Sequence, residues 1–258
     1  VKSALLLAGL KAQDVTTVSE PSLSRDHTER MLPYFGAQIE RDGTTVRVRG
    51  PQSLSAREVQ VPGDPSSAAF PAVWAAASKG SQILLRDICL NPTRTGYIAV
   101  LRRMGARISI ENIRELSGEP VGDIFVTGGE LEAATIEGGE IPTLIDEIPV
   151  LAVAACFAQG TTVIRDAGEL RVKETDRISA LVQGLAALGA QVEEMPDGLI
   201  INGPLLLRAG SVRTFSDHRI AMAFSILAKI ADITVDIDDR ECVDISFPGF
   251  FDIMEDSR

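Results

Sequence analysis

The stretch ELRVKETDR, residues 169–177, places cations and carboxylates side by side directly before an apolar, helix-like run. An arginine fork such as Arg177 matches the oxygens of a carboxylate or phosphate, and Lys173 adds a point charge. The N–H groups at the start of the following helix strengthen this preference for anions. Glu174, held ionised among the cations, would move a proton once a ligand excludes water. A solvated salt-bridge network at a helix start is the alternative interpretation.

Two further stretches show charge followed by an apolar or amphipathic run. In LIDEIPVLAVAA, Asp146 and Glu147 open a run of small and aliphatic residues. Acids at a helix start stabilise its dipole by roughly 0.3–1 kcal/mol, which explains one of the two without catalysis. In SRDHTERML, Arg25 is a candidate anion ligand, whereas Ser24 to Glu29 also fit a capping region with a solvated His27.

The fourth stretch, SDHRIAMAF, places His218 and Arg219 at the start of another buried-looking helix. A capping Ser216 or Asp217 explains the acid but not the two basic neighbours. All four stretches therefore lie where a loop enters a helix, and several helix N-termini meeting at one cleft would bind small anions strongly. The sequence lacks the Walker A, GxGxxG, GxSxG and HExxH motifs, so nucleotide-phosphate cradles, serine hydrolysis and zinc proteolysis lose support.

Composition narrows the function classes further. The formal net charge of −11 argues against nucleic acid or an anionic membrane as partner, but not against small anions bound by local groups. The apolar runs are too short for a membrane span, and no signal peptide is recognisable. Cys89, Cys156 and Cys242 sit in apolar runs without metal-ligand spacing, which favours buried free thiols, no metal, and a reducing, cytoplasmic location.

The chain repeats one plan three times, with a fourth half copy starting at residue 216. Each copy has a β-like run, a polar loop and a helix that ends in Gly-Ala before another strand. The Gly-Ala markers begin at Gly36, Gly105 and Gly189, which are 69 and 84 residues apart. The segments 66–78 and 147–159 are apolar on all sides, so their helices should be buried. An α/β fold of βαβ-type repeats with buried helices and outer sheets follows.

A break is predicted where Pro62, Gly63 and Pro65 interrupt the chain before a helix capped by Asp64 or Ser66. It divides the chain into an incomplete first domain, residues 1–62, and a second domain, residues 63–258. Because residue 1 already lies in a helix-like run without a cap, we expect this chain to be a fragment.

Five motifs stand out along the chain: RVKETDRI, SDHRIAMAFS, SRDHTERML, VPGDPSSAAF and SFPGFFDIM. Along the chain they occur in the order typical of the 5-enolpyruvylshikimate-3-phosphate (EPSP) synthase family, and the resemblance runs from the first residue to the last. SRDHTERML and LIDEIPVLAVAA are similar to its glyphosate-tolerant bacterial subgroup. The resemblance implies the enolpyruvyl transferase fold, two domains of βαβαββ repeats. It also implies transfer of the enolpyruvyl group of phosphoenolpyruvate to the 5-hydroxyl of shikimate-3-phosphate, with phosphate release, in the shikimate pathway and without a cofactor.

The resemblance also implies residue roles. Asp146 matches the carboxylate that contacts the shikimate 4- and 5-hydroxyls as candidate base, and Glu174 matches the residue that moves a proton at the methylene carbon. Both are therefore candidate catalytic residues.

Five basic residues match substrate-binding positions of the family. Lys173 and Arg25 match positions near shikimate-3-phosphate, Arg177 and Arg219 match arginines that grip phosphoenolpyruvate, and His218 adjoins them.

Two departures from the family pattern stand out. Ile245 replaces a lysine of the enteric-type members, as is usual in the tolerant subgroup. The first two-fifths of a full family chain, with several anion contacts, is absent, and one such contact is worth about 10² to 10³ in rate. We therefore expect this chain alone to be inactive or nearly so and to need a complementary N-terminal segment as its partner.

Two alternatives remain open at this point. One is a UDP-N-acetylglucosamine enolpyruvyl transferase, which shares the fold but should carry a different charged loop and a reactive cysteine. The other is a non-catalytic half-enzyme that binds a complementary segment or another protein. Exposed apolar helix faces within residues 1–62 would favour the second alternative.

Overall fold

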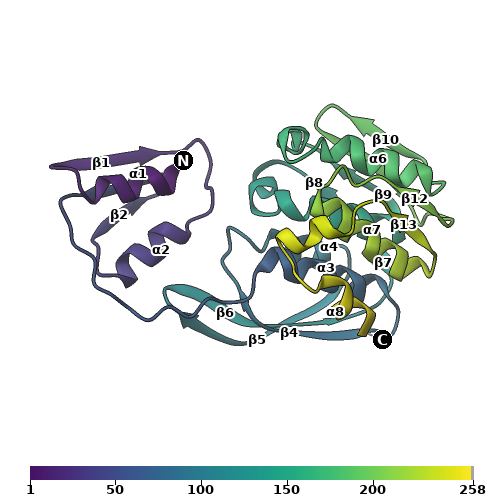
Figure 1. Ribbon diagram of the computed structural model, residues 1–258, viewed down its shortest axis with the longest axis horizontal. Coiled ribbons are helices and arrows are strands. Elements are labelled where there is room, and N and C mark those ends of the chain that lie inside the picture. The colour runs from purple at the N-terminus through teal and green to yellow at the C-terminus, as the bar shows by residue number, and fades with distance from the viewer. Residues whose placement is uncertain (257–258) are drawn as a thin grey trace.

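The buried apolar side chains form two separate clusters in the computed structural model, which describes residues 1–256. Residues 1–50 contain the smaller cluster and are called the small lobe below; residues 64–256 contain the larger one and are called the large lobe. Figure 1 shows the purple small lobe beside the large lobe. The segment between them, residues 51–63, is mostly exposed and lacks regular structure apart from one bridge at Gly63. The predicted domain division after residue 62 stays a prediction, since these clusters do not test whether either part folds alone.

Three units of the chain share the order helix, strand, helix, strand, strand. The first unit has α1 (Lys2–Gly9), β1 (Val15–Ser19), α2 (His27–Tyr34), β2 (Ile39–Asp42) and β3 (Thr45–Arg49). The second has α3 (Pro65–Ala77), β4 (Gln82–Cys89), α4 (Gly96–Arg103), β5 (Arg107–Leu116) and β6 (Glu119–Thr127). The third has α5 (Ile148–Phe157), β9 (Ala158–Ile164), α6 (Arg177–Ala187), β10 (Val192–Met195) and β11 (Gly198–Gly203). The half copy has α7 (His218–Ala231) and β13 (Val235–Ile237), and α8 (Phe250–Asp256) follows.

The three sheets also share one strand order. The third strand of each unit lies in the centre and pairs antiparallel with the other two, giving β1-β3-β2, β4-β6-β5 and β9-β11-β10. A short segment before the first helix of a unit pairs in parallel with the strand after that helix: Gly63 with Ile88, β8 (Thr135–Ile136) with β9, and β12 (Gly210–Val212) with β13. A further short strand, β7 (Leu131–Glu132), also lies parallel to β9. The predicted fold class, an α/β fold of βαβαββ-type repeats, is confirmed.

The Gly-Ala markers end the second helix of each unit in the same way. Gly36, Gly105 and Gly189 have φ values of 91°, 92° and 89°, a region that L side chains rarely adopt. The N–H group of the following alanine reaches the carbonyl five residues earlier in each copy, which is the Schellman arrangement. The repeat read from the sequence is therefore a repeat of backbone geometry.

A second set of glycines recurs at the end of the third strand in each unit. A Cβ atom on Gly50, Gly128 or Gly203 would lie 1.9–2.4 Å from carbonyl oxygens at the end of the unit's first helix. Only glycine allows this close approach of strand and helix. The contact fixes how each sheet sits on its helix.

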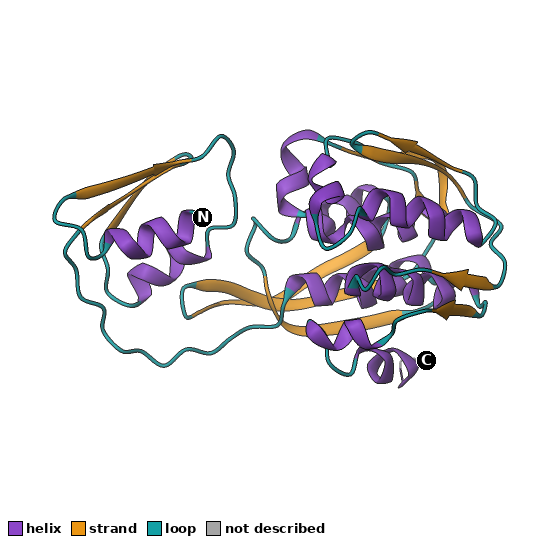
Figure 2. Cartoon of the chain, turned by 45° about the horizontal axis from the view of Figure 1, so that its top comes forward, coloured by secondary structure: helices purple, strands orange, loops and turns teal. Residues whose placement is uncertain are grey.

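Three helices, α3, α5 and α7, pack against one another inside the large lobe. Nearly every residue of α3 and α5 is buried, as their uniformly apolar sequences predict. Figure 2 shows helices lying between sheets in the large lobe, whereas the small lobe has its two helices on one face of a single sheet. Asp64 and Asp217 cap α3 and α7 by accepting backbone N–H bonds, so the capping interpretation holds at both residues.

Helix α6 rests on α7 at a glycine. A Cβ atom on Gly184 would lie 2.2 Å from the ring of Phe224, so no larger residue fits at this crossing. Within residues 1–256, every helix is too short or too polar to cross a bilayer.

Candidate active site

Asp146 lies in a short 3₁₀ turn, η2 (Ile145–Glu147), directly before α5, and its carboxylate meets cations from both lobes. From the small lobe, Nη2 of Arg25 donates to Oδ2 at 2.5 Å. The large lobe adds three cations within 4 Å of the same carboxylate: Arg177 at 3.3 Å, Lys173 at 3.8 Å and Arg219 at 3.8 Å. The four sequence stretches chosen for their chemistry thus converge on one carboxylate.

The cations set the charge of Asp146. Burial alone would raise the pKa of this carboxyl, but the charges of Arg219, Arg25 and Lys173 outweigh burial and lower it to about 2. Asp146 is therefore an anion at neutral pH. Any ligand that takes the cations away makes it a stronger base.

Arg177, the first residue of α6, is fully buried and oriented by carboxylates. Its Nε donates to Oδ2 of Asp217 at 2.8 Å, and its Nη2 donates to Glu174 at 2.6 Å. Because Asp217 also caps α7, one acid ties the starts of both helices together. The guanidinium is thereby held in one orientation before any ligand arrives.

The RVKETDR loop combines both interpretations offered for it. Lys173 pairs with Glu169 at 2.8 Å and Arg171 pairs with Asp176 at 2.7 Å, which is the salt-bridge network. Glu174, by contrast, keeps 53% of its side chain exposed beside Arg177, so its carboxylate remains available to a ligand. The loop therefore contains a stabilising ion-pair network and an exposed acid, Glu174, that is paired with Arg177.

Helix α7 begins with His218 and Arg219, both partly buried. Burial, aided by the neighbouring charge of Arg219, lowers the pKa of His218. His218 has no hydrogen-bond partner among residues 1–256, whereas Arg219 donates from Nη1 to the carbonyl oxygen of Asp146 at 3.2 Å. The His218 ring thus lies without a hydrogen bond, in the part of the chain that the structure describes, beside a cation that faces the central carboxylate.

A cavity of about 360 Å³ opens at this place between the lobes. Its lining includes Arg25, Asp146 and Lys173, together with Lys2 and Ser24 of the small lobe. Cations and an ionised acid around one cavity suit the binding of a multiply charged small anion. A carboxylate beside such an anion can also exchange a proton with it.

Three residues at the rear of the site were not predicted from the sequence. Glu147, one of the two acids of which the helix dipole explains one, is buried and accepts a 2.5 Å hydrogen bond from Ser66. Arg94 donates to the same Ser66 oxygen at 2.9 Å. Burial raises the pKa of Glu147, opposite to the shift of its neighbour Asp146. The one available signal was the cap motif around Ser66, which by itself indicates a helix start only.

Helix α2 begins within residues 24–29, as the capping interpretation predicts, but the expected side-chain cap is missing. Asp26 stands at the N-cap of α2 but makes no side-chain cap bond. Its carboxylate accepts instead from Arg30 at 2.9 Å, Arg41 at 2.8 Å and Asn91 of the large lobe at 2.7 Å. The Asp26 carboxylate thus bonds to side chains elsewhere in the fold instead of capping its own helix, because a buried carboxylate needs charged or amide donors.

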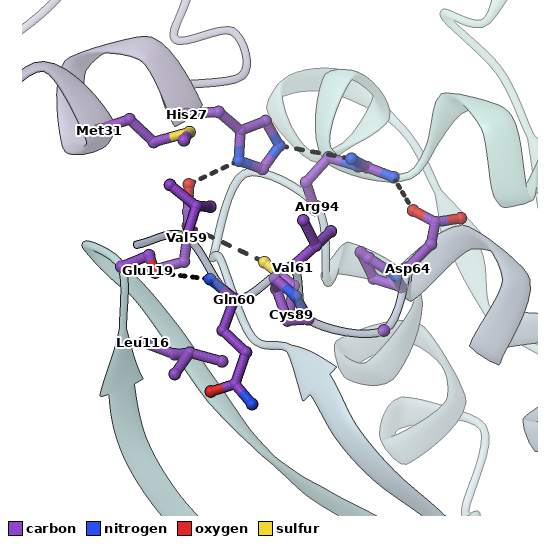
Figure 3. A pocket seen from close by; sticks show the side chains of 14 residues that line it. His27, Met31, Val59, Gln60, Val61, Asp64, Cys89, Arg94, Leu116 and Glu119 are labelled. Atoms are coloured by element: carbon purple, nitrogen blue, oxygen red, sulfur yellow. Dashed lines mark hydrogen bonds and ion pairs between the residues drawn. The ribbon is translucent and has the colours of Figure 1, made fainter. Parts of the chain in front are cut away.

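A second cavity of about 250 Å³ lies at the junction of the lobes (Figure 3). Its lining includes His27, Cys89, Arg94 and Glu119, with residues 59–65 passing along it. All three cysteines of the chain are free and buried, as predicted.

Comparison with known proteins places the chain in one family. Residues 1–254 match the family model described as EPSP synthase (3-phosphoshikimate 1-carboxyvinyltransferase). A curated protein of that name from Gloeobacter violaceus is 53% identical over 98% of this chain and 58% of its own length. One from Desulforudis audaxviator is 52% identical over the whole chain and 60% of its own length. The chain therefore spans about three-fifths of the length of these relatives.

Solved structures agree with this placement. The EPSP synthase of Acinetobacter baumannii superposes with a TM-score of 0.93 at 40% identity, over 99% of this chain and 59% of that one. The enolpyruvyl transferase NikO of Streptomyces tendae, 20% identical with a TM-score of 0.68, shares the fold. The chain belongs to the EPSP synthase family.

Proposed function

We propose that this chain forms part of the active site that transfers the enolpyruvyl group of phosphoenolpyruvate to the 5-hydroxyl of shikimate-3-phosphate and releases phosphate. The observation that carries the proposal is the Asp146 carboxylate, which four cations from both lobes surround at a cavity. Two substrates that carry phosphate and carboxylate groups need such a concentration of cations.

The resemblance to the family assigns the cations to the two substrates. Arg177 and Arg219 bind phosphoenolpyruvate, with His218 beside them, and Lys173 and Arg25 bind the phosphate of shikimate-3-phosphate. When Arg25 and Lys173 turn to that phosphate, Asp146 loses two of the charges that hold its pKa near 2. Substrate binding thereby converts Asp146 from an ion-pair partner into a base.

Two acids then move the protons. Asp146 takes the proton of the 5-hydroxyl as its oxygen bonds to C2 of phosphoenolpyruvate, while Glu174 gives a proton to the methylene carbon. In the second half, Glu174 removes a proton from the resulting methyl group as the C–O bond to phosphate breaks. The proton held by Asp146 goes to the departing phosphate oxygen, which also takes the electron pair of the broken C–O bond. Both carboxyl groups thereby return to their starting protonation states, and the steps need no cofactor.

We propose that this activity also uses a complementary N-terminal segment, so that the chain works as one part of a split or longer enzyme. The greater length of the relatives supports this proposal. So does helix α1, where Leu5 and Leu7 are 46% and 51% exposed on a face that an added segment would cover. A half-enzyme that binds such a segment without catalysis is the alternative that the same apolar face favours.

Two narrower assignments belong to the same proposal. The SRDHTERML segment and the contact of Arg25 with Asp146 support membership of the glyphosate-tolerant subgroup. The three buried free thiols support a cytoplasmic location.

Phosphate release from the two substrates tests the function. It is measured with this chain alone and with the remaining two-fifths of the Gloeobacter violaceus relative added as a separate polypeptide. We expect release only on mixing, and a loss of about 10² to 10⁴ for Asp146→Asn. Association without phosphate release would favour the half-enzyme, and release by the chain alone would refute the need for a second segment.

A further inference from the structure

A continuous chain of polar side chains connects the junction of the two lobes with Arg219. Its members are His27 of the small lobe and Arg94, Ser66 and Glu147 of the large lobe, and they are called the positioning chain below. Their contacts are His27–Arg94 at 3.3 Å, Arg94–Ser66 at 2.9 Å and Ser66–Glu147 at 2.5 Å. At its far end, Glu147 lies 3.9 Å from Nη1 of Arg219.

The inner end of the positioning chain lies beside the Arg219 guanidinium. Nη1 of Arg219 lies between the Asp146 carbonyl, 3.2 Å away, and the Glu147 carboxylate. Glu147 is 2% exposed, so its only charge partners are protein groups. Ser66 fixes that carboxylate by donating its hydroxyl hydrogen, since the same oxygen already accepts from Arg94.

Arg94 connects Ser66 with the small lobe. Its Nη2 donates both to Ser66, at 2.9 Å, and to Asp64, at 2.7 Å. Its Nη1 points away from these two residues and donates to Nε2 of His27 at 3.3 Å. Figure 3 shows this geometry, with the Arg94 guanidinium between the His27 ring and Asp64. A planar guanidinium cannot rotate to lose one of these partners without disturbing the other.

His27 has one tautomer that satisfies its neighbours. Arginine only donates, so Nε2 accepts from Arg94, and Nδ1 carries the hydrogen, donated to Glu119 at 2.7 Å. Cys89, His27 and Glu119 hold ligand-type atoms within 4.8 Å of one another. A metal on Nδ1 would move the hydrogen to Nε2, directly opposite the Arg94 donor, so the hydrogen-bonded arrangement is the better fit.

We propose that His27, Arg94, Ser66 and Glu147 act as positioning residues that orient Arg219 for its anionic substrate only when the small lobe is seated on the large lobe. When the small lobe moves away, Arg94 loses its acceptor on His27, and the hydrogen bonds that fix Ser66 and Glu147 loosen in turn. Closure of the lobes is thereby coupled to the assembly of the anion site. The substrate assignment rests on the proposed function; the coupling between the residues does not.

Ser66→Ala removes one oxygen from the middle of the positioning chain and is the sharpest test. With the complementary segment present, we expect the KM for phosphoenolpyruvate to rise about tenfold, while kcat and the KM for shikimate-3-phosphate change less than twofold. Ser78→Ala, the same change at the other end of α3, is the matched control and should behave as the unmodified chain. An equal rise in both KM values, or none, would overturn the proposal.

A double-mutant cycle tests the coupling across the lobes. His27→Gln and Ser66→Ala are each expected to raise the KM for phosphoenolpyruvate, and the double variant should be no worse than the more impaired single variant. Effects that multiply instead would mean that the two residues act independently.

Two measurements remain informative if no turnover is found. The chain has two histidines, so long-range ¹H–¹⁵N spectra resolve both rings, and we expect the Nδ1–H tautomer for His27 in the unmodified chain and a mixture in Arg94→Gln. In a crystal structure of the Ser66→Ala variant, Arg219 should leave the Asp146 carbonyl. The Nε2–H tautomer, or an unmoved Arg219, contradicts the positioning chain whether or not the chain is a transferase.

Discussion

The two lobes are built on the same repeat but stabilised by different forces. The small lobe buries six apolar residues, Leu6, Leu10, Leu32, Ala37, Val46 and Val48. Around this small core, Lys2 bonds to Glu20 and Glu29, and Asp26 accepts from two arginines. The large lobe has a continuous apolar core around α3, α5 and α7. The small lobe therefore has a small apolar core bordered by ion pairs, whereas hydrophobic burial dominates in the large lobe.

The contact between the two lobes differs in polarity from the core of either lobe. Arg25, Asp26 and His27 are consecutive, and each reaches a different partner in the large lobe: Asp146, Asn91 and Glu119. These contacts are polar, unlike the core of either lobe. Polar interfaces between domains permit relative motion, whereas the apolar core of the large lobe resists it. The small lobe is thus suited to move and the large lobe to serve as a rigid frame.

The largest effect on the free energy of unfolding is expected for a buried charge inside the large lobe. Arg177→Met leaves Asp217, itself fully buried, without its cation, and should lower the free energy of unfolding by about 3–5 kcal/mol. Thermal and urea unfolding measure this. Arg107→Met, an exposed position on β5, is the control and should change stability by less than about 0.5 kcal/mol. Equal effects would remove the contrast between buried and exposed cations.

The ion pairs of the small lobe predict a dependence on pH. Burial opposes ionisation of Asp26, but Arg30, Asn91 and Arg41 lower its pKa to about 2. A depressed pKa stabilises the fold above the ordinary pKa near 4, and this contribution is lost as pH falls from about 5 to 2. Asp26→Asn should therefore lower stability by about 2 kcal/mol at pH 7 and flatten its fall in acid.

Hydrogen exchange localises that loss. Amides of β3 in the small lobe should exchange earlier than those of α5 as the solution is acidified, and Asp26→Asn should accelerate β3 alone. Uniform acceleration across both lobes would show that they unfold as one unit.

In the core of the large lobe, replacing a helix glycine with alanine should have the opposite of its usual effect on stability. Replacing a glycine inside a helix with alanine ordinarily adds about 1 kcal/mol of stability. At Gly184 the new methyl group meets the Phe224 ring, so Gly184→Ala should instead destabilise by about 1–3 kcal/mol. Urea unfolding decides the sign, and a gain in stability would mean that α6 and α7 are less tightly packed than described.

The smallest effect on stability is expected at the surface of the small lobe. Leu7→Ser on α1 alters an exposed side chain and should change the free energy of unfolding by less than about 0.5 kcal/mol. It should nevertheless weaken association with the complementary segment, measured by sedimentation. Leu6→Ser, at a buried neighbour, is the contrasting variant and should unfold the small lobe.

The sequence predicts most of what local geometry dictates. The Gly-Ala helix ends and the buried helices depend on neighbouring residues, so their patterns are visible without the structure. The charged loops were found for the same reason, because helix starts are recognisable. Their convergence on Asp146 follows from the topology of the fold, and the roles that the family resemblance implies for them stay predictions.

What could not be predicted depends on partners far apart in the chain. Asp26 has the pattern of a cap, and its true partners include Arg41 and Asn91, 15 and 65 residues away. Glu147 looks like a dipole acid until Ser66, 81 residues before it, is placed against it. No local propensity distinguishes a carboxylate that caps a helix from one that is withdrawn to a distant donor.

The glycines at the strand ends have a consequence for how this chain tolerates change. In a library of all single substitutions, Gly50, Gly128 and Gly203 should accept no side chain at all, because helix carbonyls occupy the place of a Cβ. Gly129, next to one of them, has open space there and should accept many. Three intolerant positions, one at the same place in each unit, would trace the ancestry of the repeats even after all other sequence similarity between them had disappeared.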